Sequence, residues 1–271
     1  MTYFGFLLRF LVIPIIILIG ITLWNKRRGR ERAASLSATS VGLGIGLHVL
    51  IALFYTTPWD NYLVATGVWW YDPSLVTGIV LGWVPIEEYT FFILQPILVG
   101  LWLVLLAQTL SFREEPLRAD LRWWLPALAG IVWLGSVAVL LTGKQSGTYM
   151  ALLLAWALPP VMLQLAFGAD ILWRYRRMVF LSVIPLTLYL ITADALAISF
   201  GTWTIDPAQS FNIFIAGTLP IEEFAFFLMT NILLTFGITL VWAEASHERL
   251  ATYRQRLRQQ LSKNKQAVPE G

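Results

Sequence analysis

Two copies of one acidic motif lie within long apolar stretches of the chain. Residues 85–92 read Pro-Ile-Glu-Glu-Tyr-Thr-Phe-Phe, and residues 220–227 read Pro-Ile-Glu-Glu-Phe-Ala-Phe-Phe. Carboxyl groups inside a membrane are costly and usually mark a proton path or a substrate site. A segment that only had to cross a bilayer would not carry two adjacent glutamates, twice. The fold must therefore give these four carboxyls a role in an apolar interior.

The motif is part of a longer internal repeat. Residues 60–73 match residues 194–207 at an offset of 134, in the order Asp, Gly, Trp and Asp-Pro. Residues 82–92 match residues 217–227 at an offset of 135. The chain therefore consists of two related modules, and the glutamate pairs are equivalent points in them.

The composition is that of a membrane protein. Of the 271 residues, 58% are apolar and only 13% are charged, which excludes an ordinary soluble domain and a disordered chain. An apolar run of about 20 residues can cross the hydrocarbon core as a helix, and only a helix satisfies its own backbone there. We predict an all-α integral membrane protein with seven spans, at roughly 3–24, 36–57, 77–107, 123–142, 148–172, 179–200 and 212–243.

Basic residues give the expected orientation. Because Lys and Arg gather on the cytoplasmic side, the N-terminus is expected outside the cell membrane and the C-terminus in the cytoplasm. The net charge of +3 favours contact with anionic membrane lipid, and no nucleic-acid partner is expected. Of the 19 basic residues, those that follow runs one, three, five and seven are Lys26, Arg27, Arg28, Arg30, Arg32, Arg113, Arg118, Arg122, Arg174, Arg176, Arg177, Arg249, Arg254, Arg256, Arg258, Lys263 and Lys265.

The repeat and the spans together predict a domain organisation. Residues 1–112 form a first three-helix module and residues 146–243 a second one in the same orientation. Residues 113–145 supply the linking fourth helix that a parallel repeat of odd-numbered modules needs. Residues 244–271 form a basic cytoplasmic tail that is expected to extend the seventh helix.

The four glutamates are candidate catalytic groups. Adjacent residues on a helix point ~100° apart, so we expect one glutamate from each pair to converge on a shared pocket. Removal from water and like-charge crowding favour the protonated form of a carboxyl, and aromatic faces stabilise cations. An acid, a base and an aromatic wall suit protonation of an alkene, closure of a ring through a carbocation, and loss of a proton. The candidates are Glu87, Glu88, Glu222 and Glu223, with Phe91, Phe92, Phe226 and Phe227 as the wall.

Several other residues have two possible roles each. The glutamate pairs themselves could merely lock the third helix to the seventh by hydrogen bonds. Trp69 and Trp203 either belong to an interfacial aromatic belt or line the pocket. Asp60 and Asp194 either cap helices or join the glutamate site. Asn231 either orients a glutamate or ties helices together. Pro85 and Pro220 are supporting residues.

Missing residue types exclude some chemistry. The chain has no cysteine and only two histidines, His48 and His247, so thiolate and three-histidine metal sites are impossible within it. Gly42, Gly44 and Gly46 lack the spacing of a dinucleotide-binding turn and lie in an expected membrane helix, where small residues permit close packing. We expect no metal and no flavin.

The duplicated Pro-x-Glu-Glu motif with paired aromatics resembles the membrane-embedded lycopene cyclases of the two-subunit type, here as a fused single chain over about residues 3–243. The resemblance implies closure of the linear ends of lycopene to β-rings, with both Pro-x-Glu-Glu segments in the active site. It implies lycopene or a related linear carotenoid as substrate and other carotenoid-pathway enzymes as partners. Related enzymes that form ε-rings or act on C50 carotenoids stay open.

Three other functions make different demands on the sequence. A proton-coupled carrier has a similar arrangement of modules, but the aromatics beside the glutamates favour an apolar ligand. A retinal photoreceptor needs a lysine within the bundle, and the lysines lie in loops or the tail. A carotenoid-binding protein without activity would keep the pocket and would not need the glutamates.

Overall fold

Seven helices long and apolar enough to cross a membrane are present in the computed structural model, which describes residues 1–112 and 115–266. This confirms the prediction of an all-α, multi-span membrane protein. The first span combines α1 (Tyr3–Leu7), the π-helical segment η1 (Leu8–Val12) and α2 (Ile13–Arg27), and the second follows the short helix η2 (Ala34–Leu36). The others are α3 (Val41–Ala65), α4 (Ile86–Thr109), α5 (Leu121–Leu141), α6 (Thr148–Arg174), α7 (Arg176–Ser199) and α8 (Ile221–Trp242).

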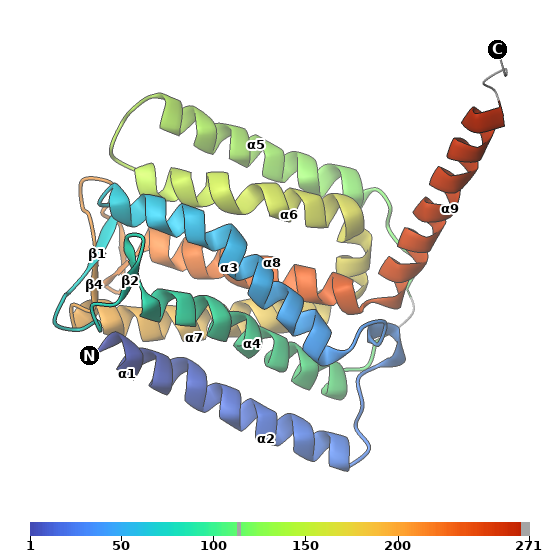
Figure 1. The fold of residues 1–271 in the computed structure, drawn as a ribbon, viewed down its shortest axis with the longest axis horizontal. Helices are drawn as coiled ribbons and strands as arrows, with labels where there is room; N and C mark the ends of the chain where they lie inside the picture. Colours follow the sequence, from blue (N-terminus) through green and yellow to red (C-terminus); the bar gives the residue numbers. More distant parts are fainter. Residues whose placement is uncertain (113–114, 267–271) are drawn as a thin grey trace.

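The helices form one bundle with α4 and α8 near its centre (Figure 1). These two spans have the largest buried shares of the seven, 61% and 50%, and they pack against each other. α5 has the smallest buried share, 11%, because it lies at one edge of the bundle and packs on α6 (Figure 1). The interior of the protein therefore surrounds the two helices that carry the glutamates.

Short strands gather at one end of the bundle, the end at which the N-terminus lies (Figure 1). β1 (Trp69–Tyr71) pairs antiparallel with β4 (Trp203–Ile205). In this pair Trp70 lies opposite Thr204, its own equivalent in the repeat, so the two loops that contain these strands meet about a local two-fold axis. The sequence did not predict these strands, which are short and lie between the spans.

The third and seventh apolar runs, which start at residues 77 and 212, are longer than a span needs, so each could either tilt or begin as a short segment before its proline. The structure shows the second arrangement, because a hairpin occupies the start of each run. β2 (Val80–Leu81) pairs with β3 (Val84–Pro85), and β5 (Phe214–Ile215) pairs with β6 (Leu219–Pro220). Their turns place Gly82 and Gly217 at φ +70° and +75°, where glycine is favoured. Each helix begins directly after the proline that ends its hairpin, and that proline is the N-cap.

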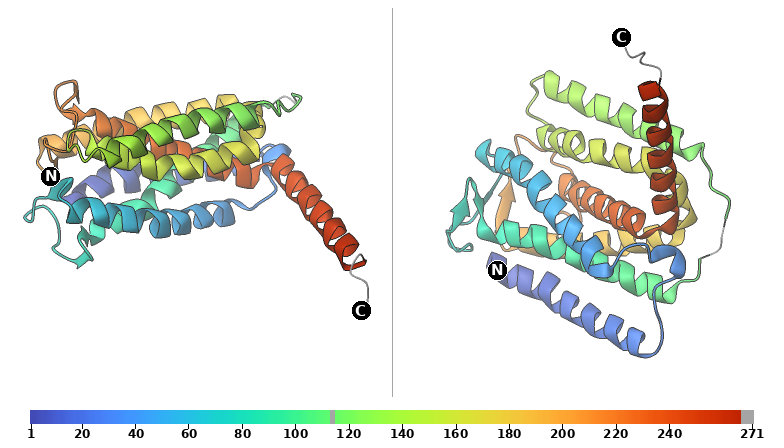
Figure 2. Two further views of the ribbon diagram at one scale, coloured as in Figure 1. Left: turned by 90° about the horizontal axis from the view of Figure 1, so that it is seen from above. Right: turned by 45° about the vertical axis from the view of Figure 1, so that its right-hand side comes forward.

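Two further boundaries differ from the prediction. α3 continues through Pro58 to Ala65 instead of ending near residue 57, so Asp60 lies inside the helix. The tail does not extend α8: Ala243 has extended backbone angles, and α9 (Glu244–Gln266) is a separate helix that leaves the bundle at an angle (Figure 2). The expected basic residues Arg113, Lys263 and Lys265 lie outside the residues whose side chains the structure describes.

Candidate active site

The first glutamate of each pair binds the loop that precedes its hairpin. Glu87 Oε1 accepts a hydrogen bond from the Thr77 amide at 2.6 Å, and Glu222 Oε1 accepts one from the Phe211 amide at 2.7 Å. Both side chains are buried, and each Oε2 is buried without a hydrogen-bond partner in the described part of the chain. Neither glutamate is among the residues that line the cavity between the two motifs, which is described next. The two first glutamates therefore have the same local role in the two copies of the motif.

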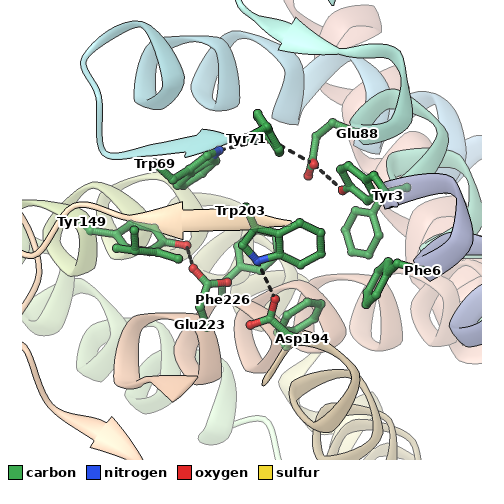
Figure 3. A pocket seen from close by; sticks show the side chains of 13 residues that line it. Tyr3, Phe6, Trp69, Tyr71, Glu88, Tyr149, Asp194, Trp203, Glu223 and Phe226 are labelled. Carbon is green, nitrogen blue, oxygen red and sulfur yellow. Dashed lines mark hydrogen bonds between the residues drawn. The ribbon is translucent and has the colours of Figure 1, made fainter. Parts of the chain in front are cut away.

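The second glutamate of each pair faces one shared cavity, here called the carboxyl cavity (Figure 3). Glu88 enters from α4 and Glu223 from α8, so the two motifs meet as expected. The cavity contains about 460 Å³ of empty space, part of it open to the surface. Its wall is largely aromatic and consists of Tyr3, Phe6, Trp69, Tyr71, Glu88, Phe91, Tyr149, Asp194, Trp203, Ile205, Glu223, Phe226 and Phe227.

Tyrosine hydroxyls hold both of these carboxyls. Glu88 Oε2 accepts hydrogen bonds from the Tyr3 hydroxyl and from the Tyr71 hydroxyl, the latter at 3.2 Å. The Trp69 indole donates to the Tyr71 oxygen at 3.1 Å and extends this chain. Glu223 Oε1 accepts a hydrogen bond from the Tyr149 hydroxyl at 2.7 Å (Figure 3). Glu223 is thus held by fewer tyrosine hydroxyls than Glu88.

Tyr3, Tyr71 and Tyr149 were not predicted as site residues, although the sequence contains a weak signal for two of them. Thr-Tyr occurs at the start of the first span and again at the start of α6. In the structure the Tyr3 amide donates to Leu75 O at 2.8 Å, and the Tyr149 amide donates to Gln209 O at 3.0 Å. Leu75 and Gln209 are 134 positions apart, like the other members of the repeat. The two tyrosines therefore occupy matching places beside the two glutamates.

Asp194 joins the carboxyl cavity, whereas Asp60 is buried outside its lining. Asp194 Oδ1 accepts a hydrogen bond from the Trp203 indole at 3.0 Å. Trp69 and Trp203 both line the cavity, so their rings face the protein interior rather than forming only an outer belt. The two copies also differ in their indole bonds, because the indole of Trp69 donates to Tyr71 and that of Trp203 donates to Asp194.

Phe91, Phe226 and Phe227 form the deep wall of the carboxyl cavity. The rings of Phe91 and Phe227 lie edge to face at 6.1 Å, and those of Phe226 and Phe227 at 5.2 Å. Phe92 lines a neighbouring cavity instead. Pro85 and Pro220 precede the glutamate helices as their N-caps, which fixes where each pair begins.

Asn231 ties helices together. Its side chain is fully buried, donates to Thr187 Oγ1 on α7 at 3.0 Å and accepts from Gln95 Nε2 on α4 at 3.4 Å. These contacts favour the helix-tying interpretation over the orientation of a glutamate. Within residues 1–112 and 115–266, no three His, Asp or Glu side chains are grouped as a metal site would require.

The fold and the site together define a class of protein: a multi-span membrane protein with paired interior carboxyls in an aromatic cavity. The chain belongs to the lycopene cyclase family, because the family described as lycopene cyclase matches residues 1–106 and 146–242. The unmatched stretch between these segments contains α5.

Curated relatives agree with this family. The chain is 44% identical over 197 residues to a lycopene beta-cyclase of Halobacterium salinarum, covering 73% of this chain and 81% of that protein. It is 34% identical over 207 residues to a bifunctional lycopene cyclase/phytoene synthase of Podospora anserina, covering 73% of this chain but 35% of that protein. A similar bifunctional protein of Colletotrichum graminicola is 36% identical over 200 residues, with 70% and 34% covered. No solved structure matches the chain significantly.

Proposed function

We propose that this protein is a lycopene β-cyclase, an isomerase that closes the linear ends of a carotenoid to β-rings. The observation that carries the proposal is the convergence of Glu88 and Glu223 on one aromatic cavity inside the membrane part of the protein. The 44% identity to the Halobacterium enzyme supports lycopene as the substrate and the β-ring as the product. The sequential products would be γ-carotene and β-carotene.

The reaction needs one proton to enter and one to leave. A carboxylic acid protonates the terminal double bond of the substrate and leaves a tertiary carbocation. The neighbouring double bond attacks this cation, which forms the ring carbon–carbon bond and moves the positive charge into the ring. A carboxylate removes a proton from the ring carbon beside the charge, and this forms the ring double bond. Atoms and electrons balance without an oxidant or a reductant.

We assign the acid role to Glu223 and the base role to Glu88. Hydrogen bonds donated to a carboxylate favour its ionised form, and Glu88 accepts them from two tyrosine hydroxyls. Glu223 accepts one from Tyr149, so its protonated form is penalised less. Two carboxyls of one apolar cavity do not both ionise readily, because like charges repel strongly where water is excluded. One acid and one base at the same site is the pattern that general acid–base catalysis requires.

The aromatic wall supplies the remaining stabilisation. An alkene is a weak base, so the rate must come mainly from stabilising the carbocation once it forms. Ring faces attract cations through their quadrupole, and Phe91, Phe226 and Phe227 lie next to the carboxyls. Among the described residues, those that line the cavity include no Lys, Arg or His that would repel a cation. We expect neither a metal nor a flavin to take part.

The wider assignments are proposals as well. The matching tyrosines, hairpins and loop pairing support two parallel modules, residues 1–112 and 146–243, joined by residues 113–145 and followed by the tail from 244 to 271. We place the protein in the cell membrane with its N-terminus outside. Its partners would be membrane lipid and other carotenoid-pathway enzymes.

The test is expression of the chain in cells that accumulate lycopene, followed by chromatography of the extracted pigments. The proposal expects ring-containing carotenoids that are absent from cells with the empty vector. Growth in deuterated water should label each new ring, because the entering proton comes from a carboxyl that exchanges with water. Unchanged lycopene in cells whose membranes contain the protein would overturn the proposal.

A further inference from the structure

A second cavity, here called the lateral cavity, adjoins the carboxyl cavity. It lies between α3, α4, α6 and α8 and contains about 770 Å³ of empty space, part of it open to the surface. Phe91 and Phe226 line both cavities. These two rings therefore form the partition between them, one helical turn beyond the glutamates.

The lateral cavity leads away from the carboxyls along the bundle. On α8 its wall runs from Phe226 to Leu234, and on α6 from Trp156 to Gln164. Eight helical steps correspond to a rise of ~12 Å. The two cavities thus follow one another along the bundle, with the glutamates at one end and the rings of Phe91 and Phe226 between them.

The side of this path between α3 and α6 opens toward the lipid. Ile51 and Tyr55 of α3 line the lateral cavity and are 49% and 40% exposed. The Tyr55 hydroxyl donates to Trp156 O at 2.8 Å and the two rings stack at 5.6 Å, which closes the end of the opening nearest the carboxyls. Beyond this contact α3 diverges from α6 toward the opposite end of the bundle (Figure 1).

The wall of the lateral cavity suits an apolar occupant. Its polar side chains mostly bind other protein groups: His48 Nδ1 lies 2.8 Å from Gly44 O, and Gln95 donates to Thr230 at 2.9 Å. The remaining wall is aliphatic and aromatic, as in pockets that bind hydrophobic ligands. No charged Lys, Arg, Asp or Glu lies among these described lining residues.

We propose that the lateral cavity binds the conjugated polyene chain of the substrate while one chain end lies between Glu88 and Glu223. This inference rests on the proposed function. The carboxyl cavity holds the reacting end of the chain beside the two carboxyls, and the rigid remainder of a C40 polyene must leave it in one direction. The lateral cavity gives that direction and lets the distal part of the chain continue into the bilayer. Phe91 and Phe226 then contact the chain where the ring-forming end joins the polyene.

The test fills the lateral cavity and measures binding without turnover. In a Glu88→Gln background, Ala52→Trp places a large ring in the cavity from α3, where Ala52 is a lining residue. Leu50→Trp is the matched control, because Leu50 lies on the same helix and is 54% exposed. Purified variants in lipid nanodiscs are equilibrated with lycopene, and bound pigment per protein is measured by absorbance after size exclusion.

We expect Ala52→Trp to lower bound lycopene at least tenfold relative to Leu50→Trp. The same substitution in the otherwise unchanged chain should lower ring formation by a similar factor. If the tryptophan variant is not recovered from membranes, Ala52→Leu gives the same comparison with a smaller loss. Equal binding in the Ala52 and Leu50 variants overturns the inference and leaves an acyl chain of a lipid as the occupant. Failure of the proposed function would be seen in a different result, because the unmodified chain would then form no rings.

Discussion

At the scale of single residues, the hydroxyl of Tyr71 stays protonated and donates a hydrogen bond to Glu88. Removal from water, and secondly the neighbouring Glu88 carboxyl, raise the pKa of Tyr71 well above its ordinary value. The phenol therefore stays protonated at neutral pH and can always donate to Glu88. This hydrogen bond orients the Glu88 carboxyl for the base role that we propose for it.

Tyr71→Phe tests this contribution. The substitution removes one hydrogen bond to a charged group, a loss of about 1.5–3 kcal/mol, so we expect turnover to fall roughly tenfold to a hundredfold. Tyr62→Phe, on the exposed side of α3, is the control and should keep turnover within about twofold. Ring formation is measured with purified protein in lipid. Equal rates for both variants would show that the Tyr71 hydroxyl does not support catalysis.

The same pKa shift predicts an effect on stability at high pH. An ordinary tyrosine titrates at about pH 10, so the unfolded chain loses the Tyr71 proton at a lower pH than the folded protein does. Above that pH the folded state binds more protons, and the free energy of unfolding falls as pH rises. Tyr71→Phe should lose less stability between about pH 9 and pH 11 than the unmodified chain. Parallel thermal midpoints of both proteins over this range would contradict the expectation.

Glycines set how closely the elements pack. A Cβ atom on Gly44 of α3 would collide with the indole of Trp242 at the end of α8, whereas Gly42 and Gly46 face open space. The packing role expected for this glycine segment is thus confined to Gly44. The π-helical turn in the first span and the hairpins before α4 and α8 are further local features that shape the bundle.

Gly44→Ala is therefore expected to destabilise the α3–α8 contact. Overpacking of a filled interior costs about 1–3 kcal/mol, so the thermal midpoint in detergent should fall by several degrees. Gly42→Ala and Gly46→Ala are matched controls on the same helix and should leave the midpoint unchanged. The midpoint is followed by fluorescence-detected size exclusion after heating. A similar midpoint for all three variants would mean that the Trp242 ring moves aside at little cost.

The membrane helices were predictable from the sequence, but the strands, several boundaries and the tyrosine partners were not. Apolar runs of sufficient length fixed all seven spans. The long third and seventh runs allowed either a tilted helix or a short segment before Pro85 and Pro220, and the sequence did not decide between them because the hairpins are themselves apolar. The sequence does not show which glutamate of each pair faces the cavity. That depends on the folded loop before each hairpin, whose amides bind Glu87 and Glu222. The tyrosine partners depend on contacts between distant helices.

At the scale of the whole molecule, the two ends of the bundle differ. The strands and the N-terminus lie at one end, and α9 leaves from the other (Figure 2). Arg249 of α9 forms a bidentate ion pair with the buried carboxylate of Asp170 on α6, with N–O distances of 2.9 and 2.6 Å. This contact fixes the start of the basic helix against the end of the bundle that we assign to the cytoplasm.

The natural absence of cysteine allows a direct test of that orientation. Single cysteines at Lys144, in the loop between α5 and α6, and at Gln255, on α9, would lie on opposite sides of the membrane. A membrane-impermeant maleimide should label Lys144→Cys in intact cells and Gln255→Cys only after permeabilisation. The reverse pattern would place the N-terminus and the carboxyl cavity on the cytoplasmic side.

The most direct test of the central claim is turnover of lycopene by purified Glu88→Gln and Glu223→Gln variants in lipid. Both substitutions keep the size of the side chain and remove its proton chemistry. We predict that each lowers ring formation at least a thousandfold, within the range of losses from removing general acid–base catalysis. Glu31→Gln, on an exposed glutamate outside the carboxyl cavity, should keep full activity. Ring formation at the unmodified rate by either cavity variant would contradict a cyclisation driven by one carboxyl from each copy of the motif.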